Sequence, residues 1–160
     1  MSLEDLKEEL SKVVEAEALL PRDYDKCGFH LEVRVRPEQV EAMAAAAREA
    51  DLFLESITAV DFSNGLQVIY QFTYAGAASR VQVRVQGTRE QSLPSISSFY
   101  NAALWHEREV FDMFGIRFEN HPDLRRILLP DDADFHPLLK DFGKVHAFRR
   151  TEEIYGDPTA

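Results

Sequence analysis

The chain has 160 residues, of which 45% are hydrophobic, and its formal net charge is -10 at pH 7. A chain of this length forms one domain around one core. The negative charge argues against a general affinity for nucleic acids or anionic membranes, because phosphate groups would be repelled over most of the surface.

Cys27 is the single cysteine of the chain, which excludes an internal disulfide. An iron-sulfur cluster usually takes about four thiolates from its host, and this chain alone cannot supply them. The seven glycines are isolated, which argues against a dinucleotide fingerprint or a phosphate-binding loop. No apolar run reaches the roughly 18 residues of a membrane span, and the acidic start of the chain is unlike a signal peptide. We therefore expect a cytoplasmic protein.

The first fifty residues alternate helical and extended patterns. Apolar residues recur at helical spacing from residue 3 to about residue 18, which predicts an amphipathic helix that ends before Pro21. Residues 29–36 alternate apolar and polar side chains, which predicts a strand with one solvent-exposed face. Pro37 at a first helical position starts an alanine-rich helix that runs to about Ala50 and can lie close to a sheet.

Three more strands are predicted between residues 52 and 86. Residues 52–62 form the first, and Asn64-Gly65 supplies the positive φ angles of a tight hairpin to a second strand over residues 66–74. In the third strand, valines at 81, 83 and 85 alternate with polar residues. These strands predict a meander whose amphipathic pattern needs one covered face.

The predicted fold class is therefore α+β. It is a two-layer α-β-α-β-β-β domain, with helices on one face of a mixed, mainly antiparallel sheet. A short helix over residues 105–114, ended by Gly115, belongs to the same domain, which we place at residues 1–118. Prolines at 122, 130 and 137 interrupt any long element after that point. Residues 119–160 are predicted to form an irregular, partner-binding tail.

Residues 105–142 combine charged and aromatic side chains, whereas residues 62–100 contain four charged residues. For Glu107, Glu109 and Asp112, the simplest interpretation is a solvated helix face with pairs between successive turns. The neighbouring aromatic residues favour another arrangement, in which Arg125 or Arg126 pairs with Glu109 or Asp112 at or near an interface.

A metal site formed by His106, Glu109 and Asp112 is an alternative for the same helix. The zinc-protease pattern fails, since the position four residues after His106 is Val110. The di-iron bundle motif has the opposite order and occurs twice. A stand-alone metal-dependent enzyme is therefore a minority hypothesis, and no catalytic, cofactor-binding or metal-ligating residue is assigned.

Three runs in this segment point to a known family. They read WHEREVFDMFGIRF from Trp105, HPDLRRILLPD from His121 and HPLLKDF from His136. Together they closely resemble the signature of the 30 kDa subunit family of respiratory complex I, whose bacterial members belong to NADH:quinone oxidoreductase. Two positions depart from the family pattern, because Leu139 stands in place of the usual arginine and Gly143 in place of the usual proline.

The resemblance implies a non-catalytic subunit of the peripheral arm, which supports electron transfer from NADH to quinone coupled to proton translocation. It implies no cofactor in this chain, with NADH, FMN, iron-sulfur clusters and quinone on other subunits. The implied partners are the quinone-site subunit and the subunit that carries the last iron-sulfur cluster, with no nucleic acid and with membrane contact only through the complex. The implied location is peripheral, on the cytoplasmic side of the cell membrane.

The resemblance also implies which residues form the subunit interface or its signature. They are Trp105, Glu107, Arg108, Glu109, Asp112, Phe114, Gly115, His121, Pro122, Arg125, Arg126, Leu129, Pro130, His136, Pro137, Lys140 and Asp141. Related subunits occur in membrane-bound hydrogenase-type complexes, so an equivalent subunit of such a complex stays open as an alternative.

Overall fold

The computed structural model describes residues 3–62, 65–74, 76, 79–87 and 91–142. Its helices are α1 (Leu3–Leu10), α2 (Tyr24–Cys27), α3 (Val40–Glu49) and α4 (Ala103–Phe114), with the 3₁₀ turns η1 (Ala16–Ala18) and η2 (Pro37–Gln39). Its strands are β1 (Leu19–Pro21), β2 (Leu31–Val35), β3 (Phe53–Phe62), β4 (Gly65–Tyr74), β5 (Ser79–Gly87), β6 (Leu93–Pro94) and β7 (Phe118–Glu119). The predicted α+β class is confirmed.

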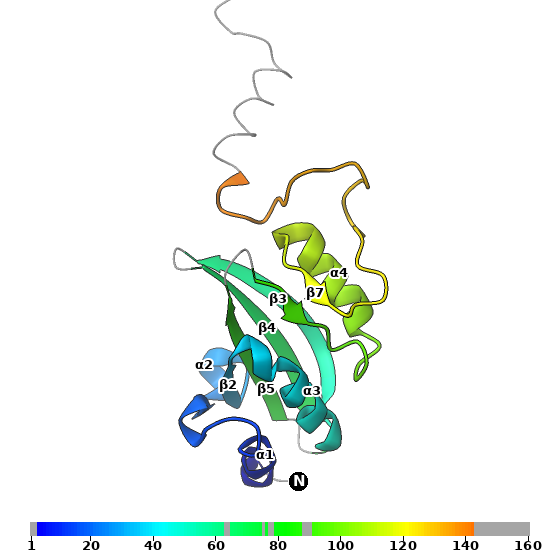
Figure 1. Ribbon diagram of the computed structural model, residues 1–160. Helices are drawn as coiled ribbons and strands as arrows, with labels where there is room; N and C mark the ends of the chain where they lie inside the picture. Colours follow the sequence, from blue (N-terminus) through cyan, green and yellow to red (C-terminus); the bar gives the residue numbers. More distant parts are fainter. Residues whose placement is uncertain (1–2, 63–64, 75, 77–78, 88–90, 143–160) are drawn as a thin grey trace, which may run out of the picture.

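Five strands form the main sheet in the order β1-β2-β5-β4-β3, and β6 pairs with β7 in a separate two-stranded sheet. The β3–β4–β5 meander is antiparallel, whereas β2 joins β5 in parallel, with Leu31 opposite Val81. A parallel pair needs a long crossover, and α3 with the β3–β4 hairpin supplies it. The sheet is therefore mixed and mainly antiparallel, as predicted (Figure 1).

The β3–β4 hairpin requires glycine at the start of β4. Gly65 has a φ of +127°, and a Cβ there would lie 2.8 Å from the carbonyl oxygen of Gly87. Both the backbone conformation and the close approach of β5 exclude a larger residue. Asn64, the other residue of the predicted turn, lies outside the described residues.

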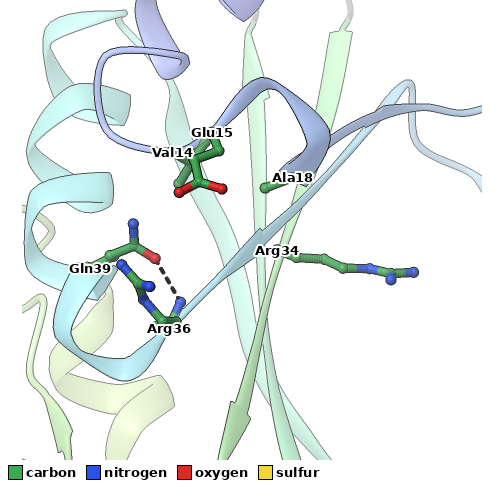
Figure 2. Close-up of a pocket in the computed structure, with 6 residues that line it drawn as sticks. All are labelled: Val14, Glu15, Ala18, Arg34, Arg36 and Gln39. Carbon is green, nitrogen blue, oxygen red and sulfur yellow. Dashed lines mark hydrogen bonds between the residues drawn. The ribbon is translucent and has the colours of Figure 1, made fainter.

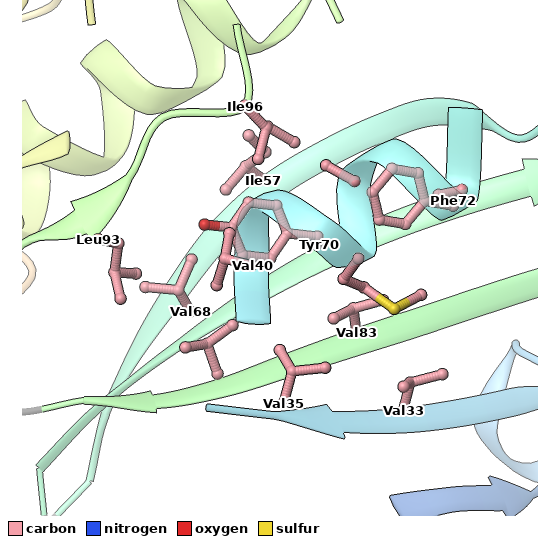
Figure 3. Close-up of a cluster of buried hydrophobic side chains, with 14 of the residues drawn as sticks. Val33, Val35, Val40, Ile57, Val68, Tyr70, Phe72, Val83, Leu93 and Ile96 are labelled. Carbon is pink, nitrogen blue, oxygen red and sulfur yellow. The ribbon is translucent and has the colours of Figure 1, made fainter. Parts of the chain in front are cut away.

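The core lies between α3 and one face of the sheet (Figure 3). Ala44 and Ala47 of α3 are 2% and 0% exposed. Their small side chains let the helix lie close to the sheet, where Tyr70 and Phe72 of β4 are buried. The alternate residues of β4 and β5 face the other side of the sheet and, apart from Ile69, are polar from Gln67 to Thr73 and from Arg80 to Gln86, as the period-two pattern predicts.

The N-terminal prediction is partly wrong. The helix predicted over residues 3–18 ends at Leu10, and residues 19–21 form β1, in which Leu19 lies opposite Val33 of β2. Pro21 is tolerated because β1 is an edge strand, where the N–H group that proline lacks is not needed for a hydrogen bond to an inner strand. Residues 11–18 of the predicted helix form a turn and η1 instead, and this change of direction brings β1 to the edge of β2, which only the folded sheet provides.

The strand predicted over residues 29–36 and the helix predicted from Pro37 are both present, with β2 shorter than expected and η2 as the first turn before α3. One residue of β2 departs from the prediction. Glu32, expected on the solvent-exposed face, is 4% exposed, because the guanidinium groups of Arg22 and Arg34 lie against its carboxylate.

Candidate functional site around helix α4

Helix α4 contacts β3, and residues 121–142, called here the tail segment, pass along the helix (Figure 1). Two hydrogen bonds donated by main-chain N–H groups fix the end of the tail segment. The N–H of Leu138 donates to the Met113 carbonyl oxygen at 3.1 Å, and the N–H of Lys140 donates to Asp61 Oδ2 on β3 at 2.9 Å. The tail segment thus packs on its own chain, while the domain boundary at residue 118 stays a prediction.

Asp112 is the centre of the site. Its side chain is 0% exposed. Its carboxylate accepts hydrogen bonds from Arg126 Nη1 at 2.6 Å and from the main-chain N–H groups of Ile127, Leu128 and Leu129 at 3.1, 2.7 and 2.9 Å. Burial alone would raise the pKa of this carboxyl, but the four donors outweigh burial and lower the pKa to about 2. Successive N–H groups that converge on one anion form a nest, so the Asp112 charge shapes residues 126–129.

The sequence left open whether Arg125 or Arg126 pairs with Glu109 or with Asp112. The structure contains the Asp112–Arg126 pair, made through one guanidinium nitrogen rather than through two. Arg125 instead bonds Asp123 at 2.9 Å, and Glu109 is exposed.

Arg108, one turn before Asp112, binds main-chain carbonyl groups of the loop that carries residues 125–129. Its Nε and Nη2 atoms donate to the carbonyl oxygens of Arg125 at 3.1 Å and Arg126 at 2.8 Å. The guanidinium group also lies 5.3 Å from the centre of the Trp105 ring, a distance that permits a cation–π contact. One helix face therefore supplies a donor for the carbonyl groups of the loop and an acceptor for its N–H groups.

Glu107 points into the core and is 0% exposed. Its carboxylate accepts hydrogen bonds from Ser95 Oγ at 2.6 Å and from the Ile96 N–H at 2.8 Å. Burial raises the pKa of Glu107 to about 7, against the lowering effect of these two hydrogen bonds. The solvated-face interpretation is therefore wrong for Glu107, as it is for Asp112.

His121 connects the start of the tail segment to α4. Its Nδ1 accepts the Asp123 N–H at 3.0 Å, so Nε2 carries the hydrogen and donates to the Leu104 carbonyl oxygen at 3.1 Å. Nε2 also lies 3.9 Å from Glu107 Oε2. Because both ring nitrogens are engaged, His121 is a structural link.

Helix α4 ends at Gly115, as predicted. Gly115 has a φ of +78°, and its N–H donates to the Phe111 carbonyl oxygen at 2.8 Å. A Cβ there would lie 2.8 Å from Cδ2 of His136. His136 in turn bonds the Asp112 carbonyl oxygen through Nδ1 at 2.9 Å. Glycine is required both for the left-handed cap and for the approach of the histidine ring.

The other signature residues are less closely involved. Phe114 is buried in the core, and Leu129 and Pro137 are half-buried. The exposed ones are Glu109, Pro122, Arg125, Pro130, Lys140 and Asp141. Of the two departures from the family pattern, Leu139 packs against the core, and Gly143 lies outside the described residues.

Sequence reasoning did not identify three residues that bond this site, Ser95, Ile96 and Asp61. Ser95 and Ile96 follow the Leu93-Pro94 pair, so that run was the available signal for the partner of Glu107. Asp61, which binds the N–H of Lys140, lies 79 residues earlier in the chain. A main-chain donor carries no side-chain signal, and no local pattern predicts such a contact.

The geometry does not support a metal at this helix. Both carboxylate oxygens of Asp112 are taken up by the donors described above, and Glu109 is exposed. Within the part of the chain that the structure describes, no group of three His, Cys, Asp or Glu side chains is placed to hold a metal ion. In the same part, no helix is long and apolar enough to cross a membrane.

The fold and the site define an α+β protein whose helix α4 and tail segment form one hydrogen-bonded unit built from a charged and aromatic motif. The family described as respiratory-chain NADH dehydrogenase, 30 Kd subunit, matches residues 33–147. The chain belongs to this family, which confirms the resemblance seen in the sequence.

Individual relatives carry corresponding descriptions. An NADH-quinone oxidoreductase subunit of Chloroherpeton thalassium is 40% identical over 106 residues, which cover 64% of this chain and 41% of that protein. The equally named protein of Trichlorobacter lovleyi is 38% identical over 117 residues, covering 69% and 72%. The mitochondrial NADH-ubiquinone oxidoreductase 30.4 kDa subunit of Neurospora crassa is 42% identical over 92 residues, covering 56% and 32%. The match therefore spans less than half of the first and third relatives.

A solved structure shares the fold. In the membrane-bound sulfane sulfur reductase, an archaeal respiratory membrane complex, one chain superposes with a TM-score of 0.77 at 23% sequence identity. The superposition covers 97% of this chain and 92% of that one. At this level of identity, the likeness establishes the architecture.

Proposed function

We propose that the chain is a non-catalytic peripheral-arm subunit of an NADH:quinone oxidoreductase of the complex I type, where it supports electron transfer by position. The observation that carries the proposal is the loop around Asp112. Its N–H groups at 127–129 are satisfied by this carboxylate, while the Leu128 side chain at its centre is 64% exposed. A rigid loop that presents an apolar side chain to solvent is suited to binding another protein.

Two more exposed apolar side chains lie along α4. Trp105 is 61% exposed and Leu138 is 54% exposed. Trp105 belongs to the helix, Leu128 is held by Asp112, and the N–H of Leu138 bonds the Met113 carbonyl oxygen. The three side chains, called here the α4 strip, are therefore anchored at successive places along one helix.

We assign the α4 strip to the quinone-site subunit, with the subunit that carries the last iron-sulfur cluster as a neighbour. In this proposal NADH, FMN, the iron-sulfur clusters and quinone are bound by other subunits. The chain then lies at the periphery of the membrane, on its cytoplasmic side, and reaches the membrane only through the complex. The family match and the exposed, anchored α4 strip support this assignment.

Co-purification from the native host tests the proposal. Leu128→Asp places a charge on the α4 strip and is expected to abolish recovery of the quinone-site subunit with the tagged chain, and with it NADH:quinone activity in membranes. Tyr24→Asp changes another exposed side chain, 43% exposed, on α2 rather than on α4 or the tail segment, and is the matched control. Normal assembly with Leu128→Asp would overturn the assignment. Recovery of hydrogenase subunits with the wild-type chain would identify the alternative host complex.

A further inference from the structure

The face of the sheet opposite α3, called here the open face, carries a second group of ordered charged side chains. A hollow of about 360 Å³ lies at its centre. The residues that line this hollow come from β2, β4 and β5, and they are Glu32, Arg34, Val35, Gln67, Arg84 and Gln86. This face is separate from α4 and the tail segment, and the proposed function makes no use of it.

Three guanidinium groups surround one carboxylate on the open face. Glu32 Oε2 lies 2.8 Å from Arg22 Nη2 and 3.9 Å from Arg84 Nε, and Glu32 Oε1 lies 2.8 Å from Arg34 Nε. Burial alone would raise the pKa of Glu32, but hydrogen bonds from Arg34 and Arg22 outweigh it and hold the pKa below its usual range. The carboxylate is therefore charged, and the cluster keeps an excess of positive charge on a chain whose formal charge is -10.

Neutral amides hold the central arginine in place. Arg84 Nη1 donates to Gln67 Oε1 at 3.0 Å, and Arg84 Nε donates to Gln82 Oε1 at 2.9 Å. Gln82 in turn bonds Gln71 at 3.2 Å, and Gln67 bonds Gln86 at 3.3 Å. The amides orient the guanidinium group without neutralising its charge, and the one carboxylate nearby, Glu32, is shared with Arg22 and Arg34. A pre-oriented guanidinium group is suited to binding a carboxylate.

Arg34 extends this charge outward. It lies opposite Arg84 in the parallel β2–β5 register, which places two like charges side by side. Its side chain is 63% exposed and extends away from Glu15 and Gln39 (Figure 2). Such an arrangement is stabilised by an added anion.

Apolar side chains border the same face at its β3 side. Val60 lies opposite Gln67 in the β3–β4 register, and Val60 and Phe62 are 36% and 41% exposed. The open face thus combines arginine, amide and aromatic side chains over four neighbouring strands. Arginine and aromatic residues are enriched where proteins bind proteins.

We propose that the open face binds an acidic segment of a partner protein, one in which Asp or Glu side chains stand beside apolar ones. The carboxylates pair with the arginines of the Glu32 cluster, and the apolar side chains cover Val60 and Phe62. A nucleic acid or an anionic membrane fits less well, because the chain outside this patch is acidic and repels an extended polyanion.

Binding of a short fluorescein-labelled peptide rich in Glu and Leu to the isolated chain tests this proposal. Arg34→Glu is expected to weaken binding by about tenfold or more, and added salt is expected to weaken binding of the wild-type chain. Glu32 keeps Arg22 and Arg84 as partners in this variant, and the Arg34 side chain is exposed, so circular dichroism is expected to show an intact fold. Arg48→Glu makes the same charge change at an exposed position of α3 and is expected to bind the peptide as the wild-type chain does.

Other outcomes would overturn the proposal. Equal weakening by Arg34→Glu and Arg48→Glu would mean that net charge, not the open face, controls binding. Displacement of the peptide by millimolar inorganic phosphate would identify a small-anion site. A dimer of the chain that Arg34→Glu dissociates would identify a second copy as the occupant.

The assembled complex supplies the second arm of the test. A photo-crosslinking residue at Gln86, which is exposed, is expected to label an acid-rich segment of another subunit, whereas labelling of no other subunit contradicts the proposal. Leu128→Asp in the isolated chain is expected to bind the peptide normally. This variant separates failure of the open face from failure of the α4 strip.

Discussion

Removing Asp112 leaves more buried polar groups without a partner than removing Arg126 does. Asp112→Ala leaves a guanidinium group and three main-chain N–H groups without their acceptor, so we expect a loss of about 3–5 kcal/mol in the free energy of unfolding. Arg126→Ala leaves Asp112 with its three N–H donors and is expected to cost about 1–2 kcal/mol. Urea melts of both variants and of the double variant measure these losses, and the double variant is expected to resemble Asp112→Ala alone.

The exposed Arg125–Asp123 pair is the control for this comparison. Its side chains are 69% and 58% exposed, so Arg125→Ala is expected to cost less than about 1 kcal/mol. Small and additive losses of stability for both Asp112→Ala and Arg126→Ala would mean that the two residues form an ordinary solvent-exposed pair.

Glu107 contributes a dependence on pH that is opposite in sign to that of Asp112. The pKa of Glu107 rises from 4.5 to about 7 on folding, so its contribution to stability is full below about pH 4.5 and is lost as the pH rises toward 7. The pKa of Asp112 falls from 3.8 to about 2, so its contribution is present above about pH 4 and is lost as the pH falls toward 2. Stability between about pH 5 and pH 8 therefore responds to Glu107 and not to Asp112.

Glu107→Gln isolates this effect, because glutamine cannot titrate and keeps an acceptor for the Ile96 N–H. The stability of the wild-type chain relative to this variant is expected to fall between about pH 5 and pH 8, by on the order of 3 kcal/mol at most. Urea melts of both proteins across this range measure the difference. Parallel pH profiles would show that Glu107 keeps one protonation state throughout.

At the scale of the element, the C-terminal caps of α2 and α4 form a matched pair. Gly28 and Gly115 have φ angles of +77° and +78°, but an added Cβ meets nothing within 4 Å at Gly28 and lies 2.8 Å from the His136 ring at Gly115. Gly28→Ala is expected to cost about 1–2 kcal/mol for the left-handed conformation. Gly115→Ala is expected to cost measurably more, because the ring of His136 must also move. Urea melts compare the two variants, and equal losses would mean that His136 is not held against the cap.

At the scale of the whole molecule, the tail segment contributes little to the apolar core. Among the described residues, the fully buried apolar side chains end at Phe118, whereas the tail segment makes polar contacts to α4 and β3 and packs the partly buried Leu124 and Leu139 against the core. We therefore expect a chain truncated after Phe118 to fold, with lower stability because Asp112 loses four donors. Circular dichroism and urea melts of the truncated chain test this expectation.

Asp112→Asn provides the control for the truncation. It is expected to cost several kcal/mol in the full chain and less than about 1 kcal/mol in the truncated chain, where the buried pair no longer exists. Loss of cooperative unfolding on truncation would place the tail segment in the core of the domain, and the boundary at residue 118 would then be wrong.

Periodicity and motif by themselves determined the fold class, the β3–β4–β5 meander, helix α3, the glycine end of α4 and the family. These features depend on local spacing or on a run of residue types, and both can be read along the chain. The periodicity failed at residues 11–18, where the predicted helix is replaced by a turn and by η1 before β1 begins. It also could not assign the parallel partner of β2, because a pairing across a long crossover has no local signal.

Only the tertiary structure decided how the charged residues of α4 differ. Glu107 and Asp112 belong to one helix and one motif, yet their pKa values are about 7 and about 2. The difference arises because Glu107 is buried with two donors, whereas Asp112 receives one guanidinium nitrogen and three N–H groups. Most of these donors are main-chain groups brought in by distant segments. Their positions depend on how the chain folds back on itself, and the identity of the side chains does not encode them.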